Sequence, residues 1–213
     1  MAKDKSDARM SDAQLVRETA AAQAAAGGVA LLIVDMINDL AFASAPAMAD
    51  AALEAARVVK ALRRDADAAG VPVIYVNDNY GQWRSGRGGI LAHCEHAGEG
   101  ARTLTRRIRP RSRDYFVVKP QVSGFYATSL PALLPRLGVN RLILTGLATD
   151  ICVLFTAADA HMRAYDLWVP EDATAGGSPD HKAWALQIMQ RSLAAETAST
   201  ARLSLAAWVA ADQ

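Results

Sequence analysis

Three residues with reactive side chains stand at or just beyond the ends of apolar, strand-like runs. Asp35 follows "ALLIV", Lys119 lies in "DYFVVKP", and Cys152 follows "RLILTG" after a short polar turn. A cysteine thiolate is a nucleophile, a carboxylate can take and return its proton, and a lysine can stabilise negative charge. Taken singly, each has an ordinary structural interpretation as a turn cap, a solvated cation or a small buried hydrophobe. Together, at strand ends, they favour nucleophilic catalysis.

Apolar runs and helical spacing predict the elements that would bring these residues together. We expect strands over 29–36, 71–78, 114–120, 141–146 and 166–173, with a sixth over 200–205. We expect helices over 47–69, 129–137, 150–164 and 179–194, with a short terminal helix. Strands that alternate with helices predict an α/β fold with a parallel sheet covered on both faces. Ligands bind beyond the carboxyl ends of such strands, so the three side chains can converge there.

Composition excludes several classes of function. A length of 213 residues suits one domain, and a formal net charge of +1 provides no global field for nucleic acid or membrane. The first residues lack the apolar core of a signal peptide, so we expect a cytoplasmic protein and no disulfide framework between Cys94 and Cys152. We divide the chain into an N-terminal helical arm or tail, 1–28, with a helix over 11–25, and a catalytic domain, 29–213.

The turn before Cys152 has physical properties that suit a nucleophile. A helix that begins there would place backbone N–H groups and its positive dipole end near sulfur, which lowers the pKa of a thiol. A nearby lysine would lower it further. The N–H groups of the turn over 149–152 can also point at a developing oxyanion.

At three segments the chain resembles the isochorismatase-like cysteine hydrolases, the superfamily of nicotinamidases and N-carbamoylsarcosine amidohydrolase. The segments are "ALLIVDMINDL", "VVKPQVSGFYATSL" and "LILTGLATDICVLFTAADA", in that order. The resemblance implies a three-layer αβα sandwich with a mostly parallel six-stranded, Rossmann-like sheet, and a homo-oligomer such as a dimer or tetramer. It implies a triad of Asp35, Lys119 and Cys152, and an oxyanion hole of the Ala148 and Cys152 backbone N–H groups. It also implies a cis peptide between Leu147 and Ala148.

At two places the chain departs from the family pattern, and these departures limit which of the family's activities we expect. Nicotinamidases place an Asp and two His around a metal after the second strand, but "YVNDNYGQW" offers Asp78 with no nearby histidine. His93, Cys94 and His96 are too closely spaced for a usual zinc site, so we expect no metal and no cofactor. The family's usual glutamine after the Asp is Ile37 here, and Asn38 can replace it in part.

These features predict a metal-independent hydrolase that cleaves an amide or carbamoyl C–N bond of a small molecule through a thioester. Isochorismatases proper lack the cysteine, so Cys152 favours acyl chemistry. An ether or ester hydrolase of the same fold, or a silent binding or redox-sensing protein, remain alternatives. For substrate contact we expect Asn38, Phe42, Trp83 and Tyr126, with specificity in the stretch 79–100.

Other polar residues receive structural interpretations. Six arginines between Arg102 and Arg113 are expected to form a solvated helix end and loop, which acids of another subunit can pair with, rather than a nucleic-acid patch. We expect His181 to cap the start of a helix, and Asp172 to anchor a loop.

Overall fold

The structure is a computed structural model, and it describes residues 28–211. The predicted helix over 11–25, and all of the predicted arm except Gly28, lie outside the described residues. Among the helices of residues 28–211, none is long and apolar enough to cross a membrane.

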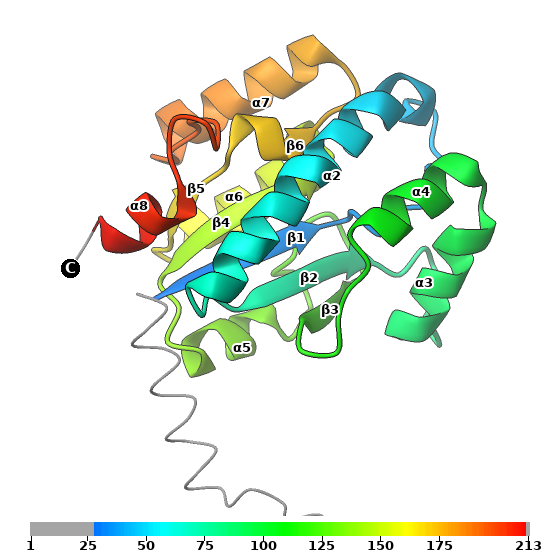
Figure 1. Cartoon of the computed structure of the whole chain (residues 1–213), viewed down its shortest axis with the longest axis horizontal. Helices are drawn as coiled ribbons and strands as arrows, with labels where there is room; N and C mark the ends of the chain where they lie inside the picture. The colour runs from blue at the N-terminus through cyan, green and yellow to red at the C-terminus, as the bar shows by residue number, and fades with distance from the viewer. Residues whose placement is uncertain (1–27, 212–213) are drawn as a thin grey trace, which may run out of the picture.

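The described chain folds around a parallel sheet, as predicted (Figure 1). Its main strands run in the spatial order β3-β2-β1-β4-β5, and the short β6 pairs with β4. The mostly parallel six-stranded sheet of the predicted α/β fold is confirmed. The strands are β1 (Val29–Val34), β2 (Val73–Asp78), β3 (Tyr115–Lys119), β4 (Arg141–Leu147), β5 (Asp166–Trp168) and β6 (Thr174–Ala175).

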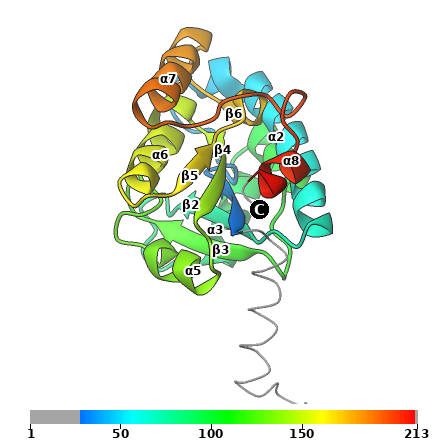
Figure 2. The same cartoon turned by 90° about the vertical axis from the view of Figure 1, so that its left-hand side faces the viewer.

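Helices cover both faces of the sheet and complete three layers (Figure 2). Alternate residues of β1 enter opposite cores: Leu31 and Ile33 pack towards α2, while Leu32 and Val34 pack towards α5 and α6. Helices α3, α4 and α8 contribute to the first core, and α7 to the second. The helices are α2 (Ala45–Ala68), α3 (Arg87–His96), α4 (Glu99–Arg107), α5 (Leu130–Arg136), α6 (Leu154–His161), α7 (Pro179–Ser192) and α8 (Leu205–Ala210), with a π-helix at Thr149–Val153 and a 3-10 helix at Glu171–Ala173.

The register of the central strands places their carboxyl ends side by side. Val34 of β1 pairs with Val76 of β2 and Gly146 of β4, and Asp78 pairs with Lys119 of β3. Gly146 has a φ of 118°, and a Cβ there would lie 1.9 Å from the carbonyl oxygen of Val34. Only glycine therefore allows the end of β4 to approach β1 this closely.

The sixth strand is not where the sequence pattern placed it. Residues 200–204 form a turn that leads into α8, and the sixth strand is instead the two-residue β6. Asp172 explains the turn, because its carboxylate accepts hydrogen bonds from the backbone N–H and the hydroxyl of Thr200. The predicted loop-anchoring role of Asp172 is thus seen directly.

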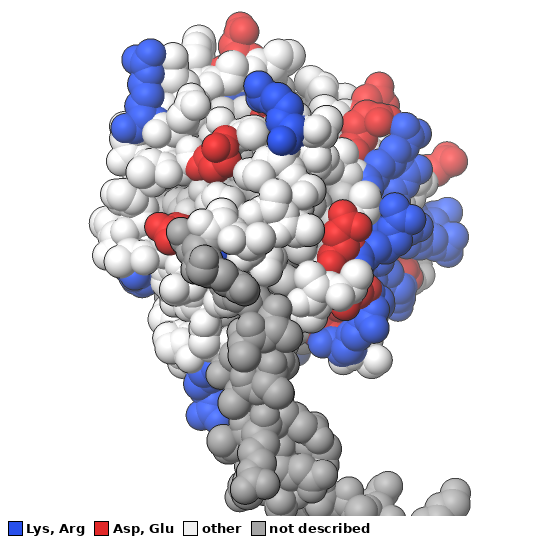
Figure 3. Space-filling model, turned by 60° about the vertical axis from the view of Figure 1, so that its left-hand side comes forward, with Lys and Arg blue, Asp and Glu red and all other residues white. Residues whose placement is uncertain are grey.

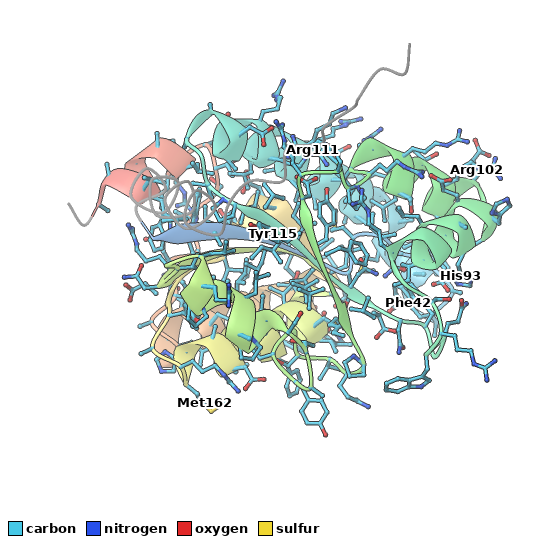
Figure 4. All side chains as sticks on the ribbon, turned by 90° about the horizontal axis from the view of Figure 1, so that it is seen from below. Phe42, His93, Arg102, Arg111, Tyr115 and Met162 are labelled. Atoms are coloured by element: carbon cyan, nitrogen blue, oxygen red, sulfur yellow. The ribbon has the colours of Figure 1, made fainter. Side chains whose placement is uncertain are left out.

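The arginine-rich stretch is paired with acids of the same chain. Arg111 contacts Asp67 and Asp114, Arg113 contacts Asp67, and Arg109 contacts Glu95. On the face drawn in Figure 3, Lys and Arg gather at one side with Asp and Glu among them. Figure 4 shows Arg102 and Arg111 well apart. Three of the six arginines therefore form ion pairs with acids of their own chain, where we expected acids of another subunit.

Candidate active site

The structure brings Asp35, Lys119 and Cys152 together at the carboxyl edge of the sheet. The Nζ atom of Lys119 lies 2.8 Å from Oδ2 of Asp35 and 3.5 Å from Sγ of Cys152. It also donates a hydrogen bond to the carbonyl oxygen of Gln121 at 3.1 Å and lies 3.6 Å from Asp78. A carboxylate and a thiol thus lie on either side of the same cation, which agrees with the convergence that the sequence predicts.

Backbone contacts hold the Asp35 carboxylate in place. Asp35 follows β1 with a φ of 48°, a left-handed conformation that turns the chain away from the strand. Its Oδ1 accepts a hydrogen bond from the backbone N–H of Asp78 at 2.7 Å, and Asn38 donates its side-chain amide to the Asp35 carbonyl at 3.2 Å. Both carboxylate oxygens therefore have a partner: Oδ1 accepts from the N–H at the end of β2, and Oδ2 contacts the ammonium of Lys119.

Ile37, the departure from the family pattern, is fixed through its backbone. Its N–H donates to Oδ1 of Asn77 at 3.1 Å, and its carbonyl accepts from Nδ2 of Asn77 at 2.8 Å and from the hydroxyl of Tyr80 at 2.5 Å. Ile37 and Asn77 are fully buried. The Asn77 side chain thus ties the turn after β1 to β2, and it holds the segment that carries Asp35.

Burial and the partner's charge shift the pKa values of Asp35 and Lys119. Lys119 has no exposed surface, and Asp35 is 4% exposed. Burial alone would lower the pKa of Lys119, but the charge of Asp35, with Cys152 and Asp78, raises it above its ordinary value. Burial raises the pKa of Asp35, and the charge of Lys119 opposes that rise without cancelling it. The lysine therefore stays a cation, and Asp35 is a stronger base than an exposed carboxylate.

The thiol of Cys152 differs from the prediction. Burial, and then the negative charge of Asp35, raise the pKa of Cys152 to about 12, and Lys119 only partly opposes them. The predicted lowering by a helix N-terminus is wrong, because Cys152 is the fourth residue of a π-helix and desolvation dominates. Cys152 and the fully buried Cys94 are both free. The resting group is a neutral thiol beside a base.

The turn that precedes the π-helix contains Ala148. Its backbone is extended, with φ −81° and ψ 145°, and its carbonyl accepts hydrogen bonds from the N–H groups of Ile151 and Val153. The described residues contain no cis peptide bond, so the predicted cis bond between Leu147 and Ala148 is wrong. The extended backbone of Ala148 leads from β4 into the π-helix.

A cavity of about 530 Å³ is lined by Asp35 and Cys152, whereas Lys119 is buried behind them and does not line it. Of the four residues that we expect to contact the substrate, Asn38 and Phe42 line it. Trp83 and Tyr126 do not line it, and their side chains are 78% and 61% exposed. Of the stretch 79–100, only Tyr80 reaches the cavity, because the rest includes α3 and the start of α4.

Sequence reasoning missed two polar residues of this cavity, Asp150 and His181. Oδ2 of Asp150 lies 3.3 Å from Nδ1 of His181, and both side chains line the cavity. Ser178 caps α7 by accepting a hydrogen bond from the His181 backbone N–H, so the imidazole itself is not used for capping. The only signal in the sequence was that Asp150 precedes Cys152 by two residues; nothing linked His181 to it.

The donor atoms around the site do not fit a metal of the kind that nicotinamidases hold after their second strand. Asp78 accepts a hydrogen bond from the Tyr80 N–H and lies beside Lys119, a cation that opposes metal binding. His93 is 2.9 Å from Asp39, and His96 contacts the carbonyl of Ala92. Phe42 and His93 lie at the same end of the molecule (Figure 4). Within residues 28–211, no group of three or more His, Cys, Asp or Glu is arranged to hold a metal ion.

The chain is similar in sequence to known proteins. Isochorismatase family protein YaaI of Bacillus subtilis (strain 168) is 40% identical over 167 residues, which cover 78% of this chain and 91% of that protein. Ureidoacrylate amidohydrolase RutB of Yersinia enterocolitica is 29% identical over 180 residues, 71% of this chain and 76% of that protein.

Among solved structures, N-carbamoylsarcosine amidase from Thermoplasma acidophilum superposes with a TM-score of 0.62 at 30% identity, over 83% of this chain and 98% of that one. An isochorismatase-like hydrolase from Alkaliphilus metalliredigens, at 21% identity, shares the fold with a TM-score of 0.67, over 84% of this chain and 98% of that one. The sequence also matches the Isochorismatase domain over residues 29–202, so the chain belongs to the isochorismatase family.

Proposed function

We propose that this protein is a cysteine hydrolase that cleaves a C–N bond, in an amide or carbamoyl group of a small molecule, through a thioester. The observation that carries the proposal is the position of the Lys119 ammonium, which contacts both the Asp35 carboxylate and the Cys152 sulfur, two groups that line the cavity. Relatives named as an amidohydrolase and as an amidase support the choice of bond.

In the proposed first half-reaction, Cys152 attacks the carbonyl carbon of the substrate. Because the pKa of the thiol is about 12, its proton moves to Asp35 as the S–C bond forms. The developing oxyanion accepts hydrogen bonds from the backbone N–H groups of Ala148 and Cys152. Asp35 then gives the proton to the leaving nitrogen, the C–N bond breaks, and an amine or ammonia departs.

The second half-reaction hydrolyses the thioester. Asp35 takes a proton from water, the resulting hydroxyl attacks the thioester carbon, and the C–S bond breaks. The proton returns to the sulfur of Cys152, and the carboxylic or carbamic acid leaves. Throughout, Lys119 stays charged and stabilises the Asp35 carboxylate whenever that group is ionised. The donor set does not fit a metal, and no step is assigned to one.

Ammonia release from a panel of small amides, ureido acids and carbamoyl compounds tests this function. We expect at least one compound to be hydrolysed, and Cys152→Ala and Asp35→Asn to abolish that hydrolysis. Cys94→Ala is the matched control, because it removes the other thiol, and it should retain activity. Hydrolysis by Cys152→Ala at the wild-type rate would refute the mechanism. The raised pKa of Cys152 argues against the redox-sensing alternative, because sensor thiols have low pKa values.

We also propose that the protein forms a homo-oligomer in the cytoplasm. Phe155 of α6 and Trp184 and Ile188 of α7 are large apolar side chains with 52%, 60% and 48% of their surface exposed. Exposed apolar side chains of this kind favour association. Light scattering coupled to size-exclusion chromatography measures the mass; a monomer at micromolar concentration would contradict the proposal.

A further inference from the structure

The cavity presents more negative than positive charge to a bound molecule. Asp35, Asp78 and Asp150 all line it, whereas Lys119 lies fully buried beside the first two. If Asp35 and Lys119 are counted as a neutral pair, two carboxylates remain. His181 also lines the cavity, and it adds a positive charge only when it is protonated. At neutral pH the cavity wall is therefore net negative.

Asp150 is the carboxylate whose charge is least compensated. Its Oδ1 is buried without a hydrogen-bond partner, and its Oδ2 faces His181 at 3.3 Å. The side chain is only 20% exposed, so water screens its charge poorly. Asp150 and Cys152 both line the cavity, so the Asp150 carboxylate and the reactive sulfur face the same bound molecule.

Another part of the cavity wall is apolar. Phe42, Met48, Leu147 and Ile151 line it. Such a wall binds the hydrocarbon part of a ligand and offers no hydrogen bond from a side chain to a carboxylate. A ligand that suits both parts of the wall has an apolar body and a neutral or positively charged polar end.

We propose, on the basis of the hydrolase function above, that this cavity selects neutral or cationic amides with an apolar body and rejects substrates that carry a carboxylate. Asp150 is the specificity-determining residue. An N–H or ammonium group meets an acceptor there, whereas a carboxylate meets a like charge. This preference would separate the protein from its relative named for ureidoacrylate, a compound that is itself a carboxylate.

The charge selection can be measured at Cys152 without a known substrate. Two methanethiosulfonates, one with a trimethylammonium-ethyl group and one with a sulfonatoethyl group, transfer opposite charges to a thiol. In both cases the Cys152 thiolate attacks the reagent's sulfenyl sulfur, a mixed disulfide forms, and methanesulfinate leaves. Peptide mass spectrometry at one fixed pH follows each rate at Cys152, and each is divided by the same reagent's rate with 2-mercaptoethanol.

We expect the normalised rate to be about tenfold higher for the cationic reagent, since one nearby charge acts with opposite sign on the two reagents. Asp150→Asn should lower the ratio about tenfold. Asp166→Asn, which removes a carboxylate from the start of β5, should leave it unchanged. A wild-type ratio at or below one, or a ratio that Asp150→Asn does not change, would overturn the proposal. If Asp150→Asn fails to fold, a wild-type ratio that does not fall with added salt would overturn it too.

Hydrolysis of three benzamides distinguishes this proposal from the proposed function. They carry a para methyl, aminomethyl or carboxylate group, so they differ mainly in charge. Hydrolysis that depends on Cys152 and favours the carboxylate compound would refute the charge selection and leave the hydrolase function standing. If no amide of any panel is hydrolysed, the proposed hydrolase function is refuted. The ratio of the two labelling rates still tests whether the cavity favours a positively charged ligand.

Discussion

Replacing Lys119 by Met tests how the charges of the site depend on one another. The substitution removes the cation with little change of volume and leaves the Asp35 carboxylate buried without its 2.8 Å partner. Two unit charges at that distance attract by about 6 kcal/mol at an effective dielectric constant of ~20, and burial offsets part of this. Removal of one partner from a buried pair costs about 3–5 kcal/mol. We expect Lys119→Met to lose about 3 kcal/mol of unfolding free energy at pH 8.

Urea unfolding, followed by tryptophan fluorescence, measures this loss and its pH dependence. Without Lys119 the pKa of Asp35 in the folded state rises further above its unfolded value, so the folded state binds the proton more tightly. The penalty is therefore small at low pH and grows as pH rises through the folded pKa. Lys119→Met should come closer to wild type at pH 5 than at pH 8.

A double-mutant cycle with Asp35→Asn separates the ion pair from simple loss of packing. In Lys119→Met/Asp35→Asn no unpaired carboxylate remains at position 35, so the double variant should be less destabilised than the sum of the singles by about 2–3 kcal/mol. Additive losses within about 0.5 kcal/mol, or a penalty for Lys119→Met that does not change between pH 5 and pH 8, would refute the reasoning.

Three further predictions follow from the same geometry. Because the pKa of Cys152 is about 12, its alkylation by iodoacetamide should rise about tenfold per pH unit from pH 7 to 9, and a plateau below pH 8 would contradict that pKa. Because the pKa of Asp35 is raised, kcat/KM for any hydrolysed amide should fall with acid at a pH above the usual carboxyl range; full activity at pH 4 would contradict this. Gly146→Ala should lower the free energy of unfolding by more than about 3 kcal/mol or prevent folding, since its Cβ would lie 1.9 Å from the Val34 oxygen. Gly88→Ala in α3, where a Cβ meets open space, is the control and should leave that free energy unchanged or raise it by about 1 kcal/mol. Thermal unfolding measures both.

Much of the fold was predictable from local patterns. Continuous apolar runs end at Asp35, at Lys119 and just before the turn that leads to Cys152, and parallel strands must bring such ends to one edge. The triad contacts follow from that rule and from the segments that resemble the family. The two-residue β6 was beyond such reasoning, because it is shorter than any periodic signal.

Features that depend on tertiary packing could not be predicted. Asp150 and His181 lie far apart in the sequence and meet only because α7 packs beside the π-helix. The pKa of Cys152 depends on how completely the site is desolvated, and local sequence does not encode that quantity. Trp83 follows a strand end as Tyr80 does, yet only Tyr80 turns into the cavity, where its hydroxyl reaches the carbonyl of Ile37.

Rapid quenching of the reaction, with mass spectrometry of the Cys152 peptide, tests the central claim most directly. With the first amide that the panel shows to be hydrolysed, we predict a mass increase equal to the acyl group on Cys152. We predict none on Cys94 and none in Cys152→Ala. Steady hydrolysis without acyl-Cys152, accompanied by full activity of Cys152→Ala, would contradict the account.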